Sequence, residues 1–404
     1  MNMNPLRKIV GIVLVLLLPL GVMAQGSSAA DTTLSVAERN AAQGFNDTID
    51  RLDPNFVTVS LVIADPGDIL YSSFGHAMLH LECPVFHLDY IFSYESEGIS
   101  NNWGRFLKGN LKMGMFAIDP DTVYAPYRAE GRGVKEYKLN LSPTQKQELW
   151  RIMDELAAIG PNQPYDYYTR GCAISVVHVI KRALQGQNIE YSLWPEKFKG
   201  TLRELGYECV TKAHRPWNRF ALMTLAGSGI DNPTISKERK LIVPADLVEI
   251  WQKAKIDGKP LLEREPTVKV ESTIVDEPKW WISPLALSLL VLLLAFVPWR
   301  AFDYMVLVIV TFIGVMVCYT VCLSSLPCTS WNWLIIPFNI LPALAWHWRR
   351  YWSLPYAGII VVWCIGMLSA PHRLVEYAHI VLALAFCVVL IKQSSLLLTL
   401  HSKK

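Results

Sequence analysis

One cysteine and its surroundings suit nucleophilic chemistry. Cys172 follows the aromatic, polar stretch 165–171, and from Ile174 onward apolar residues recur at helical spacing. A cysteine in the first turn of a helix meets the positive end of the helix dipole and unpaired backbone N–H groups, which lower the pKa of a thiol. The pattern therefore predicts a nucleophile at Cys172. The alternative is a small, buried core residue.

A histidine about a hundred residues upstream could act as the base. The stretch Ser72–Leu81 (SSFGHAMLHL) places His76 at the start of a strand-like segment. Its imidazole would take the thiol proton, the thiolate would attack an ester or amide carbonyl, and backbone N–H groups would stabilise the oxyanion. Either His87 or Asp89, on the next predicted strand, could orient this ring. His80 shares a strand face with His76 and is expected to pack.

Other charged and aromatic residues are candidates for either structure or substrate binding. Glu130 and Arg132 are expected to pair and hold the fold, with a substrate role as the alternative. Tyr167 and Arg170 lie in the loop before the cysteine, where they could contact substrate or only pack. His178 is six residues beyond Cys172, on another face of the predicted helix, so it is a poor candidate for the base.

The elements that must position these residues predict an α+β domain. Thr144–Ile159 is strongly amphipathic and follows Ser142, a good N-cap, and Pro143, a good first residue. Tyr207–Val210 and Phe220–Leu225 resemble late strands, after a helix expected near Pro195. The clearest predicted strands are Phe56–Ala64, Gly75–Glu82, His87–Tyr94 and Leu111–Ile118. The histidine precedes the cysteine, which is the order expected of a circularly permuted papain-like fold.

The chain divides into four regions. Residues 1–24 contain Arg7 and Lys8, an apolar run and a small-residue cleavage pattern, as in a secretory signal peptide. Residues 25–225 form the predicted catalytic domain, and 226–279 a linker with a short helix. Residues 280–404 are almost continuously apolar and predict a helical membrane domain. An uncleaved N-terminal anchor is the alternative to the signal peptide.

Five apolar segments predict about five membrane spans. They are Trp281–Pro298, Tyr304–Leu323, Trp333–Trp346, Pro355–Ala370 and Tyr377–Ile391. Lys and Arg then gather on one side, which places the N-terminal domain in the periplasm and the C-terminus in the cytoplasm of an inner-membrane protein. His372 and Arg373, in an outside loop, are expected to flank a span, with phosphate binding as the alternative. A net charge of +3 without a basic stripe excludes nucleic acid as a partner.

The cysteine count sets an expectation about redox state. The exported region contains Cys83, Cys172 and Cys209, and an odd number leaves at least one thiol free. Cys172 is expected to be free, with Cys83 and Cys209 as a possible disulfide. No spacing of cysteines and histidines is typical of a zinc site, and no cofactor is predicted.

A longer pattern resembles a known family. Residues 56–225 resemble the N-terminal periplasmic domain of the Lnb family, the lipoprotein N-acyltransferases of some Gram-negative bacteria. Gly171, Ser93 and Glu95 differ from the residues common in the family, which has Asn before the cysteine. The matching pieces are 74–77, 89–94, 106–111, Tyr127, Glu130, Arg132, 139–142 and 165–167 leading to Cys172.

The resemblance implies a reaction and its partners. A phospholipid would transfer an acyl chain to Cys172, and the N-terminal amine of a diacylated lipoprotein would then receive it. The apolar half would hold both lipid substrates. Two alternatives remain: a membrane-tethered peptidoglycan amidase or endopeptidase, against which the number of spans argues, and a non-catalytic membrane-anchored interaction module.

Overall fold

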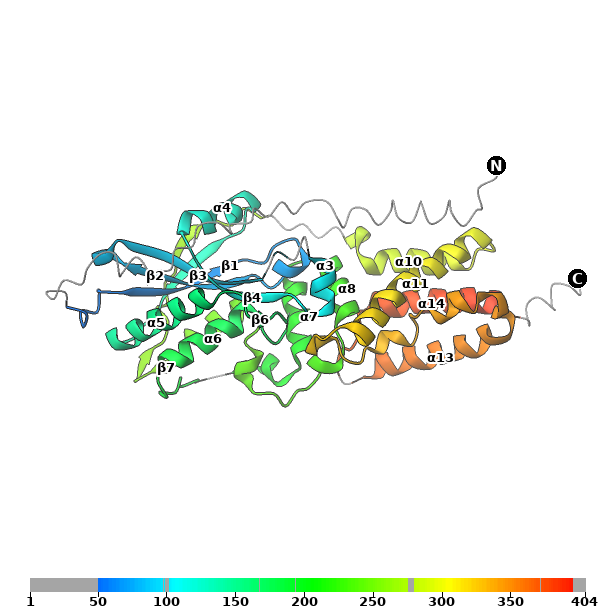
Figure 1. Cartoon of the computed structure of the whole chain (residues 1–404). Helices are drawn as coiled ribbons and strands as arrows, with labels where there is room; N and C mark the ends of the chain where they lie inside the picture. The colour runs from blue at the N-terminus through cyan, green and yellow to red at the C-terminus, as the bar shows by residue number, and fades with distance from the viewer. Residues whose placement is uncertain are drawn as a thin grey trace, which may run out of the picture.

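The protein consists of a domain of sheet and helices and a bundle of apolar helices, which lie end to end (Figure 1). The computed structural model describes residues 50–96, 98, 102–166, 168–192, 194–274, 280–370 and 372–394. The predicted signal peptide, residues 1–24, lies outside the described residues. The prediction of an α+β domain is confirmed.

A seven-stranded antiparallel sheet organises the N-terminal domain, in the order β6-β4-β3-β2-β1-β5-β9. The strands are β1 (Thr58–Ala64), β2 (His76–Cys83), β3 (Leu88–Ser96), β4 (Lys112–Ile118), β5 (Val134–Lys138), β6 (Gln163–Pro164) and β9 (Thr267–Val270), with a separate hairpin of β7 (Lys255–Ile256) and β8 (Lys259–Pro260). The predicted early strands therefore exist, with ends shifted by one or two residues.

Helices cover both faces of this sheet. α4 (Pro120–Glu130) lies on one face, and α5 (Pro143–Ile159) and α6 (Cys172–Ala183) lie on the other (Figure 1). The predicted cap of α5 is confirmed, because the Ser142 side chain accepts a hydrogen bond from the backbone N–H of Gln145 in a capping box.

Strand alternation decides which side chains face which helices. Leu79 and Leu81 of β2 are buried in the large core that also contains residues of α5 and α6. Met78 is instead buried in a smaller core with residues of α4. His76 and His80 share the parity of Met78, so both histidines belong to the face that α4 covers.

Two predicted late strands are helices in the structure. α7 (Leu202–Lys212) contains Tyr207–Val210, and α8 (Pro216–Leu225) contains Phe220–Leu225. Thr201 caps α7 by accepting a hydrogen bond from the N–H of Glu204, in a second capping box. Short apolar runs do not distinguish a strand from a buried helix, and here the caps decide in favour of helix.

The predicted linker, 226–279, is mostly part of the domain. α9 (Pro244–Trp251) packs into the large core, where Trp251 and Leu262 are fully buried. β9 extends the sheet by pairing with β5. The N-terminal domain therefore reaches Val270, about forty-five residues beyond its predicted end.

In the described part of the apolar half, the α-helices are α10 (Pro284–Ala295), α11 (Arg300–Leu323), α12 (Leu341–Leu344), α13 (Arg349–Ser369) and α14 (Tyr377–Lys392). Two helical stretches, Arg300–Leu323 and Trp346–Ser369, are long and apolar enough to cross a membrane. α10 and α14 are apolar but shorter. The structure thus supports a membrane protein, with fewer clear spanning helices than predicted.

The third predicted span is not a continuous helix. Segment 333–346 begins next to the N-terminal domain, where Asn332 donates a hydrogen bond to Thr224 O (2.8 Å), and ends where the Trp346 ring packs on Tyr304. The chain therefore passes along the bundle in short turns. Pro337 contributes to this, because it removes a backbone donor and interrupts a helix, whereas Pro342 lies in the first turn of α12, where proline is tolerated.

Candidate active site

Cys172 is the first residue of α6, as the sequence predicts. Gly171 precedes it in an extended conformation, so the thiol lies at the opening turn of the helix. The backbone N–H groups of Cys172 and Ala173 approach the sulfur, and so does that of Ala77 from β2. Burial outweighs these donors and raises the pKa of the thiol. The resting group is therefore a thiol that needs a base.

A tight turn places His76 at the start of β2. Gly75 has φ +82°, and a Cβ on it would lie 2.5 Å from the carbonyl oxygen of Ala64. Only glycine fits this turn, which brings the histidine to the end of the sheet. Burial, and to a lesser degree the positive charge of Arg132, lower the pKa of His76 to about 4. The ring is thus neutral at pH 7 and can accept a proton.

The two predicted catalytic residues converge at one end of the sheet. The N–H directed at the Cys172 sulfur belongs to Ala77, the residue that follows His76 in the chain. β2 and β3 separate here, because their pairing stops at Met78–Ser93 while β3 continues with β4. Nε2 of His76 hydrogen-bonds Oγ of Ser93, and the residue next to His76 directs its backbone N–H at the sulfur.

A buried hydroxyl orients His76. The Nε2 atom of His76 lies 2.8 Å from Oγ of Ser93, which is fully buried. Ser93 also hydrogen-bonds the carboxylate of Glu95. A chain from Glu95 through Ser93 to Nε2 would fix the tautomer that leaves Nδ1 free to take a proton. Sequence reasoning saw these two residues only as departures from a family pattern; their i, i+2 spacing on a strand could have placed both beside His76.

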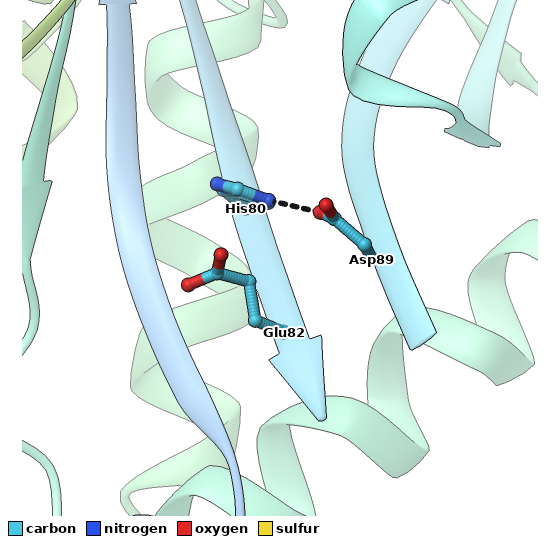
Figure 2. Close-up of side chains that lie close together, drawn as sticks. All are labelled: His80, Glu82 and Asp89. Atoms are coloured by element: carbon cyan, nitrogen blue, oxygen red, sulfur yellow. Dashed lines mark hydrogen bonds and ion pairs between the residues drawn. The ribbon is translucent and has the colours of Figure 1, made fainter. Parts of the chain in front are cut away.

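Asp89 does not orient His76, which corrects that prediction. Asp89 Oδ1 lies 2.6 Å from Nε2 of His80, as Figure 2 shows. The Nδ1 atom of His80 donates to Glu136 at 2.8 Å. Strand register explains the difference, because Asp89 stands opposite Glu82, six residues along β2 from His76.

The surroundings of His80 form a charged network. Tyr124 donates a hydrogen bond to Glu136, and Nζ of Lys269 lies 3.3 Å from its other oxygen. Burial opposes the charge on His80, but the hydrogen bonds to Glu136 and Asp89 and the charges of Glu136 and Glu82 outweigh it and raise the pKa of His80. This histidine is therefore an imidazolium held by carboxylates.

The side chains of His80 and two nearby carboxylates could be interpreted as metal ligands. Donor atoms of His80, Glu82 and Asp89 lie within 4.8 Å of one another (Figure 2). A metal would need an unprotonated ring nitrogen, whereas both nitrogens of His80 are hydrogen-bonded to carboxylates. We interpret the group as an ionic network of the sheet.

The possible disulfide between Cys83 and Cys209 is not formed. All eight cysteines, each within the described part of the chain, are free thiols. Cys83 ends β2, whereas Sγ of Cys209 lies 3.9 Å from the carbonyl oxygen of Ser73, just before the same strand begins. β2 spans eight residues, each of which adds about 3.3 Å to its length. The two thiols lie near opposite ends of this strand, too far apart to form a disulfide.

Glu130, Arg132 and Arg170 make contacts within the domain. Arg132 is buried, with an ion pair to Glu130 (3.1 Å), a hydrogen bond to Asp65 O and its guanidinium 4.7 Å from the Tyr127 ring centroid. This agrees with the structural role expected of the Glu130–Arg132 pair. Arg170 is exposed and closes the loop before α6, where its N–H donates to Asp166 O. The predicted contact residue Tyr167 lies outside the described residues.

Asp166 ties the loop before Cys172 to the apolar half. Its carboxylate is fully buried and accepts hydrogen bonds from the N–H groups of Tyr168 and Thr169. The other oxygen accepts from the N–H of Cys328, at 3.3 Å, in the loop after α11. The catalytic loop and the membrane half are therefore directly linked.

The loop containing His372 and Arg373 also binds the N-terminal domain. His372 Nδ1 lies 3.2 Å from Glu204, and Arg373 donates a hydrogen bond to the Tyr207 hydroxyl. These contacts with α7 show that both residues join the two halves.

The fold and the site define a class: an α+β domain with a cysteine at a helix start and a strand histidine beside it, fixed to an apolar helical half. Residues 45–203 match the family model described as the Lnb N-terminal periplasmic domain. The N-terminal domain is thus of the Lnb periplasmic type over these residues. No curated protein and no solved structure matched the chain.

The family match indicates a periplasmic location for the N-terminal domain and an enzymatic role. A periplasmic N-terminal domain fits a protein whose following helices are long and apolar enough to cross a membrane. Membership also suggests an enzyme of the Lnb type.

Proposed function

We propose that the protein is a membrane-bound lipoprotein N-acyltransferase. It moves an acyl chain from a phospholipid, by way of a thioester on Cys172, to the N-terminal amine of a diacylated lipoprotein. The observation that carries this proposal is the position of the Cys172 sulfur, which is approached by the N–H of Ala77, the residue after the neutral His76, and follows a loop tied to the membrane half.

The first half-reaction would acylate the cysteine. His76 takes the thiol proton while the sulfur attacks the ester carbonyl of the phospholipid. The backbone N–H groups near the sulfur, from Ala77 and Ala173, are the nearest donors for the oxyanion. The C–O bond then breaks, the leaving alkoxide takes the proton from His76, and a lysophospholipid departs.

The second half-reaction would return the enzyme to its resting state. The lipoprotein amine attacks the thioester carbonyl, the C–S bond breaks, and the proton lost by the amine returns by way of His76 to the sulfur. Water would compete with the amine for the thioester. The burial of the thiol, together with the aromatic residues Tyr127 and Tyr165 around it, favours the amine.

The proposed architecture is a circularly permuted papain-like domain. Its support is the order of His76 on an early strand and Cys172 on a later helix, which approach each other at the sheet end. The proposed topology is a multi-pass inner-membrane protein with a periplasmic N-terminal domain and a cytoplasmic C-terminus.

Mass spectrometry of lipoprotein N-termini tests the function. A strain that lacks the protein should accumulate diacylated lipoproteins, and the wild-type chain should restore the third acyl chain. Cys172→Ala, present in the membrane at the wild-type level, should not restore it. Full N-acylation by that variant would overturn the proposal.

A further inference from the structure

An apolar cavity lies between the catalytic loop and the membrane half. Residues from both halves line it, including Leu70, Phe106, Leu222, Leu225, Leu326 and Cys328. α3 (Trp103–Lys108) and α8 contribute from the N-terminal domain, while Thr320 of α11 and the loop after it contribute from the apolar half. Only an apolar ligand suits such a lining.

Tyr165 lies beside the cavity and packs against the same core as Cys172. The ring centroids of Tyr165 and Phe106, a cavity residue, are 6.0 Å apart. Burial raises the pKa of Tyr165 well above its usual range, and the thiols of Cys172 and Cys328 add to the rise, which places Tyr165 within electrostatic reach of both. One tyrosine therefore stands between the thiol and the cavity.

The cavity extends to the contact between α8 and α11. Thr320 and Leu225 line this side, where α8 and α11 pack together. Farther along α11, Phe312, Val315 and Leu323 are exposed, as expected of side chains in contact with lipid tails. The cavity thus borders a helix that has exposed apolar side chains.

The enclosed space is narrow in this state of the protein. Its volume is about 30 Å³, close to the share of one water molecule in the liquid. Flexible leucines make up much of the lining, so a chain of methylene groups would enter as these side chains change rotamer. A bulky or polar ligand would not fit.

We propose that this cavity binds one fatty acyl chain, the chain that Cys172 carries as a thioester, and that Leu225 limits its length. This inference rests on the proposed function. It adds a specificity-determining residue in the junction between the two halves.

Chain-length preference tests the role of Leu225. The full-length protein, in nanodiscs that contain phospholipids of defined acyl length, would be assayed by intact mass spectrometry for acylated Cys172. Leu225→Trp should shift the preference toward shorter chains, by about tenfold for each two methylene groups lost. Leu225→Ala should shift it toward longer chains. Leu156→Trp is the matched control, because Leu156 is half-buried on α5 and does not line the cavity.

A photocrosslinking experiment tests the cavity even where a variant fails to fold. Wild type and Cys172→Ala, in the same nanodiscs, would be illuminated with a phospholipid that carries a diazirine at the end of one acyl chain. Crosslinks should fall on peptides containing Phe106, Leu222 or Leu326 in both proteins, and excess phospholipid without the diazirine should reduce them.

The outcomes separate the cavity from the function. Two results would overturn the proposed acyl-chain site: crosslinks confined to the outer faces of the helices, or a chain-length preference that Leu225→Trp and Leu225→Ala leave unchanged. Acylation of Cys172 in the same experiments would still support the proposed function. No acyl group on wild-type Cys172 would overturn the function, and crosslinks at the three named residues would then still support a lipid-chain site.

Discussion

Two histidines on one strand face have opposite electrostatic environments. His76 and His80 are four residues apart on β2, and both face α4. His76 has a single hydroxyl partner, and burial, with the nearby charge of Arg132, lowers its pKa to about 4. His80 is hydrogen-bonded through both ring nitrogens to Glu136 and Asp89, and its pKa is raised.

This comparison shows that the hydrogen-bonding partners of a histidine, more than the strand face on which it lies, determine its role. The neutral ring of His76 has a lone pair for a proton and lies at the sheet end beside the thiol. The protonated ring of His80 has none, and it joins charged groups on β2, β3 and β5. The same residue type on one strand is thus suited to catalysis at one place and to stability at the other.

The largest expected effect is the loss of activity on removal of the base. His76→Ala should slow acyl transfer by about a thousandfold, because general-base catalysis typically contributes that much. Its thermal unfolding should stay near that of wild type. The exposed His178 on α6 provides the control, and His178→Ala should remain active. Wild-type rates in His76→Ala would assign the base elsewhere.

The second effect is a loss of stability at the other histidine. His80→Gln should lower the free energy of unfolding by about 3 kcal/mol, because it leaves the buried Glu136 carboxylate without its charged partner. Activity per folded molecule should be retained. Denaturant unfolding of the detergent-solubilised chain measures the change.

A smaller change is expected from the other partner of His80. The Asp89 side chain is 58% exposed, so Asp89→Asn should cost less than about 1 kcal/mol. Equal losses in His80→Gln and Asp89→Asn would contradict the dominant role assigned to Glu136.

The pH dependence of stability should have opposite signs at the two histidines. Because its pKa is raised, protonated His80 stabilises the folded state. This stabilisation is complete below a pH of about 6.5 and is lost as the pH rises through the folded-state pKa. The lowered pKa of His76 instead costs stability as pH falls from about 6.5 to 4, by up to about 3 kcal/mol.

The corresponding glutamine variants measure these signs. The stability difference between wild type and His80→Gln should shrink as pH rises above 6.5. The free energy of unfolding of His76→Gln should rise relative to that of wild type as pH falls toward 4. Parallel pH dependence in the two variants would show that the two rings do not differ in charge as described.

The smallest expected effect on the rate concerns the orientation of His76. Ser93→Ala removes the hydrogen bond to Nε2 and should lower the rate of acyl transfer by about fivefold, since a neutral hydrogen bond contributes about 1 kcal/mol. Ser93→Thr, which keeps the hydroxyl, should recover part of the rate. A loss in both variants together with lower stability would indicate a packing role only.

Local patterns in the sequence predict the elements that contain the reacting groups. Cys172 at a helix start and the Gly75–His76 pair at a strand start depend on short-range rules of capping and turns, which the sequence contains directly. The same rules predict α5 from Ser142 and Pro143.

Features set by long-range pairing could not be predicted in this way. The register of β2 with β3 brings Asp89 within hydrogen-bond distance of His80 and Ser93 within hydrogen-bond distance of His76. This register depends on the length of the turn between the strands. β9 forms from a charged segment because the edge of β5 accepts it. The link from Asp166 to Cys328 spans 162 residues, beyond any local pattern.

Intact mass spectrometry of the purified full-length protein tests the central claim most directly. The protein would be incubated with phospholipid in the absence of a lipoprotein acceptor. We expect wild type to gain the mass of one acyl chain on the peptide containing Cys172, and hydroxylamine to remove it as it removes a thioester. Cys172→Ala should gain nothing, and His76→Ala should react far more slowly. An unmodified wild-type protein, or an acyl group on any other residue, would contradict this account.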